Sequence, residues 1–125
     1  MLTNCAVQTT IPYVDYNRAR QFYEDILGFT ASQETPGGIA YECGDGTSFV
    51  LYPSQFAGTA QNTAMGFNTK DLENEVSELR ARGLVFEEYD FPHLKTVNGI
   101  AEIPGGRVAW FKDTEGNTIG VTQLG

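Results

Sequence analysis

The first half of the chain alternates apolar and polar residues and then changes to a helical period. Between Cys5 and Pro12 every second residue is β-branched, which is typical of a strand. From Asp15 to Gly28 the apolar residues recur at spacings of three and four, so we predict an amphipathic helix. Asp15 is placed to cap the first turn of this helix with its carboxylate, and Gly28 to end it in the left-handed conformation.

Three short apolar runs follow this helix and predict three strands with glycine-rich turns between them. The predicted strands cover Phe29–Glu34, Ile39–Cys43 and Ser48–Tyr52. Residues 1–53 are therefore predicted to form a βαβββ module. A mostly small and polar stretch, residues 54–62, is predicted to be the linker that follows it.

The same order of elements restarts in residues 63–125, which we predict to be a second module. Its predicted elements are extended segments at Ala64–Asn68, Leu84–Tyr89, Arg107–Lys112 and Thr118–Gln123, and a helix that Asp71 caps. Phe91–Gly106 has no counterpart in the first module and contains two prolines and the only histidine. We expect this insertion to be a loop that covers a site.

Charge and composition narrow the classes of partner. The 125 residues include 16 acidic and 8 basic side chains, for a net charge of −8, which repels nucleic acids and anionic lipid and attracts cationic ligands. No apolar run approaches the roughly 20 residues that cross a bilayer. Because the N-terminal residues lack a basic start and an apolar stretch, we expect no secretory signal and a cytoplasmic protein.

Two motifs within these elements point to a known family. Asp15 to Phe29 reads Asp-x-x-x-Ala-x-x-Phe-Tyr-x-x-x-Leu-Gly-Phe, and Asp113 to Asn117 reads Asp-x-x-Gly-Asn. The chain thereby resembles the glyoxalase, bleomycin-resistance and extradiol-dioxygenase superfamily, also called vicinal oxygen chelate proteins, over nearly its whole length. The resemblance implies an α+β fold, with two βαβββ modules in tandem forming a curled mixed sheet around a cleft. It also implies a homodimer, with the cleft either within one chain or between two.

The resemblance further implies four positions for metal ligands, on the first and last strands of each module. In this chain those positions hold Gln8, Val50, Ala64 and Gly120. A catalytic metal usually has at least three protein ligands, and three of these four residues have no coordinating side chain. We therefore expect no metal and no cofactor. The alternative is a relocated site built from His93, Glu87, Glu88 and Glu102.

Alternation along the strands divides their residues between the cleft and the core. The predicted ligand-binding residues on these strands are Gln8, Thr10, Ser48, Tyr52, Asn68 and Thr122. The resemblance implies that Trp110 also faces the cleft, and His93 is added from the expected loop. The residues predicted to pack beneath the helices are Val7, Ile11, Phe49, Leu51, Met65, Phe67, Ile119 and Val121. In a second interpretation, Trp110 and Tyr52 fill the cleft as part of the core.

Three functions are compatible with this sequence. The first is a metal-independent protein that binds a cationic or aromatic small molecule in an aromatic-walled cleft. The second is an enzyme, a lyase, isomerase or dioxygenase-like relative, with a non-standard metal site or with acid–base chemistry through His93. The third is a structural or regulatory dimer whose own side chains fill the cleft.

Overall fold

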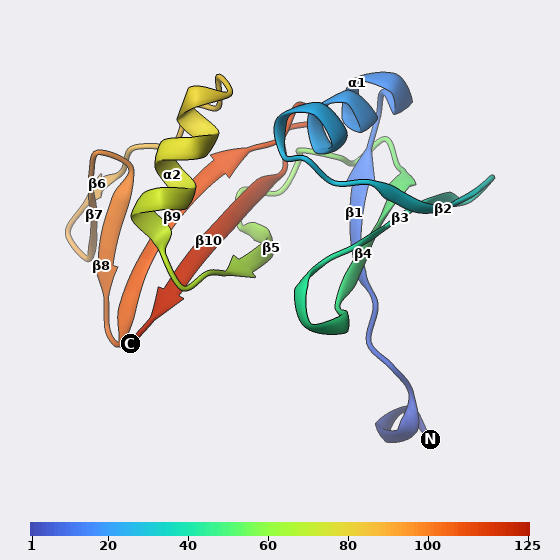
Figure 1. The fold of residues 1–125 in the computed structure, drawn as a ribbon, viewed down its shortest axis with the longest axis horizontal. Coiled ribbons are helices and arrows are strands. Elements are labelled where there is room, and N and C mark those ends of the chain that lie inside the picture. Colours follow the sequence, from blue (N-terminus) through green and yellow to red (C-terminus); the bar gives the residue numbers. More distant parts are fainter.

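Each half of the chain forms one sheet in the computed structural model, which describes residues 1–125 (Figure 1). The first sheet contains β1 (Thr9–Tyr13), β2 (Ala31–Thr35), β3 (Gly38–Glu42) and β4 (Ser48–Pro53), in the order β1-β4-β3-β2. β1 and β4 pair in parallel, and the other neighbours pair antiparallel. This is the sheet of a βαβββ module.

The second sheet repeats this arrangement and extends it. It contains β5 (Thr63–Asn68), β6 (Asp90–Phe91), β7 (Leu94–Val97), β8 (Ile100–Ile103), β9 (Gly106–Lys112) and β10 (Thr118–Leu124). The order is β5-β10-β9-β8-β7-β6, and β5 pairs with β10 in parallel. The α+β fold with two repeated modules is confirmed, with six strands in the second sheet where the first has four.

The insertion between Phe91 and Gly106 is not the predicted loop. It forms parts of three antiparallel strands, β6 to β8, joined to each other and to β9 by short turns. Asn98 and Gly99 connect β7 to β8 with φ values of 53° and 81°. An Asn-Gly pair with positive φ at both positions favours a tight hairpin because its twist matches that of the flanking strands. The high proline and glycine content of the insertion therefore reflects hairpin turns.

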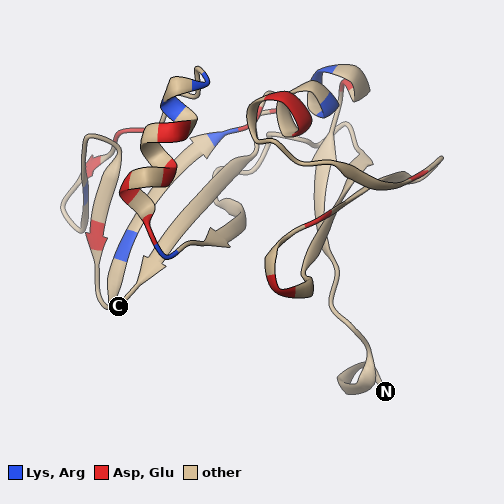
Figure 2. Cartoon of the chain, viewed as in Figure 1, with Lys and Arg blue, Asp and Glu red and all other residues tan.

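The helices begin at the predicted caps. The first consists of α1 (Tyr16–Gln21) and a π-helical continuation, η2 (Phe22–Ile26), and the second is α2 (Leu72–Ala81). Asp15 accepts a hydrogen bond from the Arg18 amide at 3.0 Å, and Asp71 accepts one from the Asn74 amide at 3.1 Å. Neither helix is long and apolar enough to cross a membrane. Acidic side chains occur on both modules (Figure 2).

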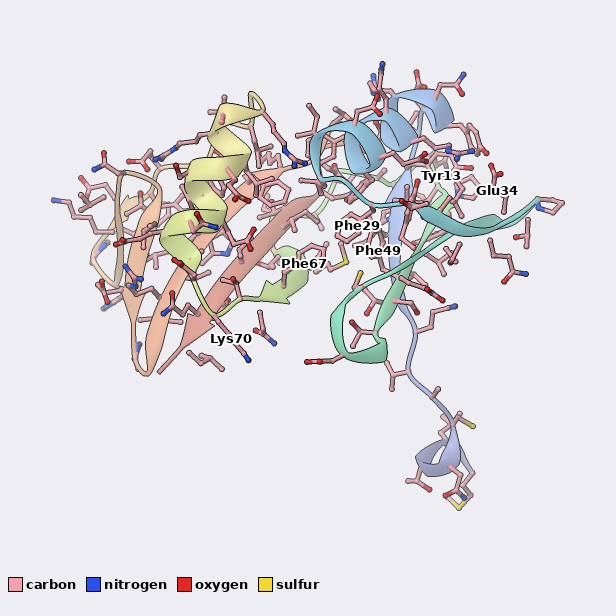
Figure 3. The ribbon with its side chains drawn as sticks, viewed as in Figure 1. Tyr13, Phe29, Glu34, Phe49, Phe67 and Lys70 are labelled. Atoms are coloured by element: carbon pink, nitrogen blue, oxygen red, sulfur yellow. The ribbon has the colours of Figure 1, made fainter.

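One apolar core joins the two modules beneath the helices. Phe29 lies 5.3 Å from Phe49 of β4 and 5.7 Å from Phe67 of β5, measured between ring centroids (Figure 3). Fully burying one such ring contributes about 2 kcal/mol to stability. The residues predicted for this core are buried or half-buried, with one exception. The prediction is wrong for Val7, which is 97% exposed because it precedes β1 in a segment that leaves the sheet (Figure 1).

Candidate functional site

The turn between β9 and β10 fastens the second module to the first. Asp113 is buried, and its Oδ1 accepts hydrogen bonds from the amides of Glu115 and Asn117 at 2.9 and 2.8 Å. Its Oδ2 accepts a hydrogen bond from the Tyr23 hydroxyl of the first module at 2.7 Å. Asn117 Nδ2 donates to the Pro12 carbonyl at 2.8 Å. The Asp-x-x-Gly-Asn motif is therefore a structural link between the modules.

Glu115 completes this link with a fully buried carboxylate. It accepts hydrogen bonds from the amides of Val14 and Asp15 at 2.9 and 2.8 Å, and from Arg18 Nε at 2.8 Å. Burial alone would raise the pKa of Glu115, but these hydrogen bonds outweigh it and lower the pKa to about 2. Glu115 is therefore ionised at neutral pH and is committed to holding the start of α1.

Each sheet has one face covered by a helix and an open face on the other side. On the first sheet the open face carries Thr10 and Val50, which lie opposite each other on β1 and β4. Ser48 and Tyr52 share this face because they lie two residues from Val50. Thr10 and Ser48 are exposed, Tyr52 is half-buried, and Gln8 is exposed just before β1. Four of the predicted ligand-binding residues thus come from one edge and one face of the first module.

The open face of the second sheet carries three more of the predicted residues. Thr122 of β10 lies opposite Asn68 of β5 and opposite Val108 of β9. Trp110 lies opposite Gly120, one row further along the sheet. Ser48 and Asn68 also line a common groove of about 300 Å³ between the two modules. The structure therefore places most of the predicted residues on two open faces, and among them only Ser48 and Asn68 line a common groove.

Trp110 lines a groove of about 560 Å³ on the second open face. Its Nε1 donates a hydrogen bond to Thr63 Oγ1 at 3.2 Å, and the Tyr89 ring meets it edge-on at 5.5 Å between centroids. Phe91 stacks on Tyr89 at 5.8 Å. Burial raises the pKa of Tyr89, so its hydroxyl remains protonated at neutral pH. Three aromatic rings thereby form one wall of the groove.

The linker forms another part of the groove lining, because two glycines allow its backbone to approach the second module. Residues 58–63 line the groove. A Cβ at Gly58 would overlap the Glu115 carbonyl oxygen, and one at Gly116 would lie 3.1 Å from the Gly58 Cα. Only residues without side chains allow this approach. Lys112 is the only side chain in the lining that is charged at neutral pH.

The four positions implied for metal ligands do not fit a metal. Gln8 is their only side-chain donor, and no group of three His, Cys, Asp or Glu side chains in the structure is arranged to hold an ion. At Gly120, a Cβ would lie 3.5 Å from two atoms of the Trp110 indole. The indole and the Thr63 methyl group thus lie over the fourth position, where the family pattern expects a ligand.

His93 lies apart from the other predicted residues. It is exposed and lines another groove, of about 790 Å³, between α2 and the strands β6 to β8. This groove meets the Trp110 groove at Phe91 and Leu94, which line both. Conversely, Tyr89 and Phe91 belong to the Trp110 groove but were not predicted for it. Their signals were the alternation of two aromatic residues and the Asn98-Gly99 pair, which together predict strand and hairpin rather than loop.

A pair of βαβββ modules, each with one open face of small, polar and aromatic side chains, is the architecture of a known superfamily. Residues 6–121 match the Glyoxalase/Bleomycin resistance protein/Dioxygenase superfamily, and the chain belongs to this superfamily. A sequence search of curated proteins gives no match.

Solved structures share this fold. The chain is similar to TnmS3, an antibiotic binding protein from Streptomyces sp. CB03234, with a TM-score of 0.72 and 25% identity over 94% of this chain and 93% of that one. It is also similar to a glyoxalase/bleomycin resistance protein from the same Streptomyces, with a TM-score of 0.68 and 24% identity over 93% and 97% of the two chains. The chain is also similar to lactoylglutathione lyase from Agrobacterium tumefaciens, with a TM-score of 0.65 and 20% identity over 96% of this chain and 93% of that one. The last two likenesses show the fold alone.

Proposed function

We propose that the chain binds an aromatic small molecule against Trp110, on the open face of the second sheet, without a metal. The observation that carries this proposal is the groove itself, where a tryptophan, a tyrosine and a phenylalanine lie together and remain partly open. Its volume of about 560 Å³ is in the range of small-molecule pockets. The similarity to TnmS3, an antibiotic binding protein, supports an organic ligand of antibiotic size.

The lining favours stacking over charge recognition. An aromatic ligand between Trp110 and the linker gains about 0.5–1.5 kcal/mol for each well-placed ring pair, in addition to the burial of its surface. The net charge of −8 attracts cations over a longer range, but the groove contains Lys112 and no carboxylate. We therefore propose an aromatic ligand, with any cationic group pointing out of the groove. Thr118 and Lys112 would orient the polar groups of the ligand.

We further propose that the functional unit is a homodimer. The open face of the first sheet offers Thr10, Ser48 and Tyr52 to solvent, without a covering element in its own chain. Laid across the Trp110 groove of a second copy, this face would complete a cleft with residues from both modules. The cytoplasmic location stays a prediction from the sequence.

Metal content separates this proposal from the enzyme alternative. Inductively coupled plasma mass spectrometry of the protein, purified without chelators, is expected to show zinc, nickel, iron and manganese well below one ion per chain. The physical reason is that Gln8 is the single side-chain donor of the four family positions. A stoichiometric metal would contradict the proposal and favour a relocated site.

The binding proposal is tested by thermal-shift screening of a library of aromatic compounds that includes antibiotics. Compounds that raise Tm for the natural chain are then tested on Tyr89→Leu, with Phe56→Leu as the matched control. Phe56 is an exposed aromatic residue outside the groove lining. We expect the Tm increase to shrink in Tyr89→Leu and to persist in Phe56→Leu. Equal responses in the two variants, or no stabilising compound, would contradict the proposal.

A further inference from the structure

A second groove lies on the helix-covered face of the second sheet, between α2 and the outer strands. Its volume of about 790 Å³ exceeds that of the Trp110 groove. It exists because α2 packs on β9 and β10, while the sheet continues through β8, β7 and β6 beyond the helix (Figure 1). The strands β6 and β7, which have no counterpart in the first sheet, therefore have no helix of their own on this face.

The floor and outer wall of this groove are apolar. Val76 of α2 is buried, and Ile100 of β8 is half-buried against the core. Val97 lies opposite Ile100 on β7 and is 65% exposed. An apolar strip thus runs from the core beneath α2 to the solvent. Covering it with an apolar chain would remove this surface from water, which is favourable at about 25 cal/mol per Å².

Cations without acidic partners lie at the rim of the same groove. Four of the eight basic side chains in the protein form ion pairs, and Lys70, Arg80, Arg82 and Lys95 form none. Two of these four, Arg80 and Lys95, line this groove together with the only histidine. Arg80 Nη2 donates to the Asn98 carbonyl at 2.7 Å, which leaves its other donors without a protein acceptor.

The carboxylates of the lining do not neutralise these two cations. Glu73 pairs with Arg107 at 3.0 Å, which leaves Glu102 as the only unpaired carboxylate in the groove. Arg80, Lys95 and Glu102 together carry a formal charge of +1 in a protein whose net charge is −8. Asp90 lies opposite Lys95 on β6 but forms no ion pair with it. At 0.15 M ionic strength the screening length is about 8 Å, so an anion in the groove responds to the free donors of Arg80 and Lys95 as well as to Glu102 and Asp90.

We propose that this groove is a second binding site, for an organic carboxylate with an apolar chain. The carboxylate would lie at Arg80 and Lys95, and the chain would lie along Val76, Val97 and Ile100. Arginine suits this role because its planar fork matches a carboxylate. The residues of this proposed site lie on the opposite face of the sheet from Trp110, although Phe91 and Leu94 line both grooves. The proposal does not depend on the function proposed for the Trp110 groove.

Octanoate and its uncharged analogue octanamide provide the probes. Titrated into ¹⁵N-labelled protein, octanoate is expected to shift the amide resonances of Ser77, Asn98 and Ile100 in a saturable way. Octanamide has the same chain without the charge, and it should bind about tenfold more weakly because it lacks charge-assisted hydrogen bonds. Equal affinities for the two probes would overturn the proposal. It would also be overturned if these amides showed no saturable shift up to about 10 mM octanoate, a range that detects a Kd of roughly 1 mM.

Variants locate the carboxylate. The double variant Arg80→Gln with Lys95→Gln should weaken octanoate binding about tenfold or more. Lys70→Gln is the control, because Lys70 is an exposed unpaired cation outside the groove (Figure 3). Val97→Glu places a carboxylate at an exposed position on the wall and should also weaken binding. Binding that survives Val97→Glu, or that falls as much in Lys70→Gln as in the double variant, would overturn the proposal.

Discussion

The open faces of the two modules derive from the same repeat but differ in what surrounds them. The first sheet has four strands, and its open face carries Thr10 and Tyr52. The Tyr52 ring has no aromatic partner on that face. On the second sheet, Trp110 lies between the linker and the aromatic residues Tyr89 and Phe91. Adding strands to one copy of a repeat has thus turned one of two equivalent faces into a groove.

The turns that close the last hairpin of each module differ in the same way. Asp45 in the first module is exposed, and its side chain makes no hydrogen bond with the rest of the chain. Asp113 in the second module is buried and accepts four hydrogen bonds. One turn only closes its hairpin, whereas the other also holds two modules together. Turns that a sequence repeat makes equivalent can therefore have very different effects on stability.

The largest expected effect comes from replacing the two aspartates by asparagine. Asp113→Asn should lower the free energy of unfolding by about 4 kcal/mol, because two buried donors, the Tyr23 hydroxyl and Asn117 Nδ2, lose an acceptor. Asp45→Asn should change it by less than about 0.5 kcal/mol. Urea denaturation measures both. Similar losses in the two variants would show that the turns are equivalent after all.

A pH dependence tests the same link through Glu115. The pKa of Glu115 is about 2 in the folded protein and near the ordinary 4.5 in the unfolded chain, so the unfolded state takes up the proton first. The stabilisation, about 3 kcal/mol, is present above pH 4.5 and is lost as pH falls towards 2.

Urea denaturation between pH 7 and pH 2 should therefore show stability falling below about pH 4.5. Glu115→Gln should flatten this part of the curve. Glu73→Gln is the control, since Glu73 forms an exposed ion pair with Arg107 and should leave the curve unchanged. A natural chain and a Glu115→Gln variant with parallel curves would contradict the assignment.

Replacing Tyr89 tests whether the aromatic wall of the second open face binds the ligand. For an aromatic compound found by screening, Tyr89→Leu should raise Kd about tenfold, because an edge contact to Trp110 and part of the groove wall are lost. Isothermal titration calorimetry gives the value. An unchanged Kd would place the ligand away from the aromatic wall.

A smaller effect is expected for Tyr52→Leu on the first module. If this face of a second copy closes the cleft, Kd should rise about threefold to fivefold, with the change confined to the dimer. Analytical ultracentrifugation of the same samples gives the oligomeric state. A Kd that does not respond to Tyr52→Leu in the dimer would show that the second module binds its ligand alone.

The sequence predicts the repeated core well because core positions obey short-range rules. Asp15 and Asp71 cap helices, and Phe49 and Ile119 alternate with outward-facing neighbours, so local patterns determine these features. Val7 was misplaced because alternation does not show where a strand leaves its sheet.

The sequence predicts the candidate site less completely because its parts are far apart along the chain. Trp110 was predicted from the family pattern, but its partners Tyr89 and Thr63 lie more than 20 and 40 residues earlier. Proline and glycine in Phe91–Gly106 suggested a loop, although the Asn98-Gly99 turn was the stronger local signal. His93 was assigned by its chemistry alone, and hydrogen-bond pairing of β6 and β7 places it on another groove.

Binding of an aromatic ligand against Trp110 can be tested directly by the fluorescence of Trp110, the only tryptophan in the chain. Its fluorescence is recorded while an aromatic compound that raises Tm is titrated into the protein. If the ligand binds against Trp110, we expect a saturable quench or shift of the emission, with the same Kd as calorimetry gives. Tight binding that leaves the fluorescence of Trp110 unchanged would show that the ligand lies elsewhere and that the Trp110 groove is not the binding site.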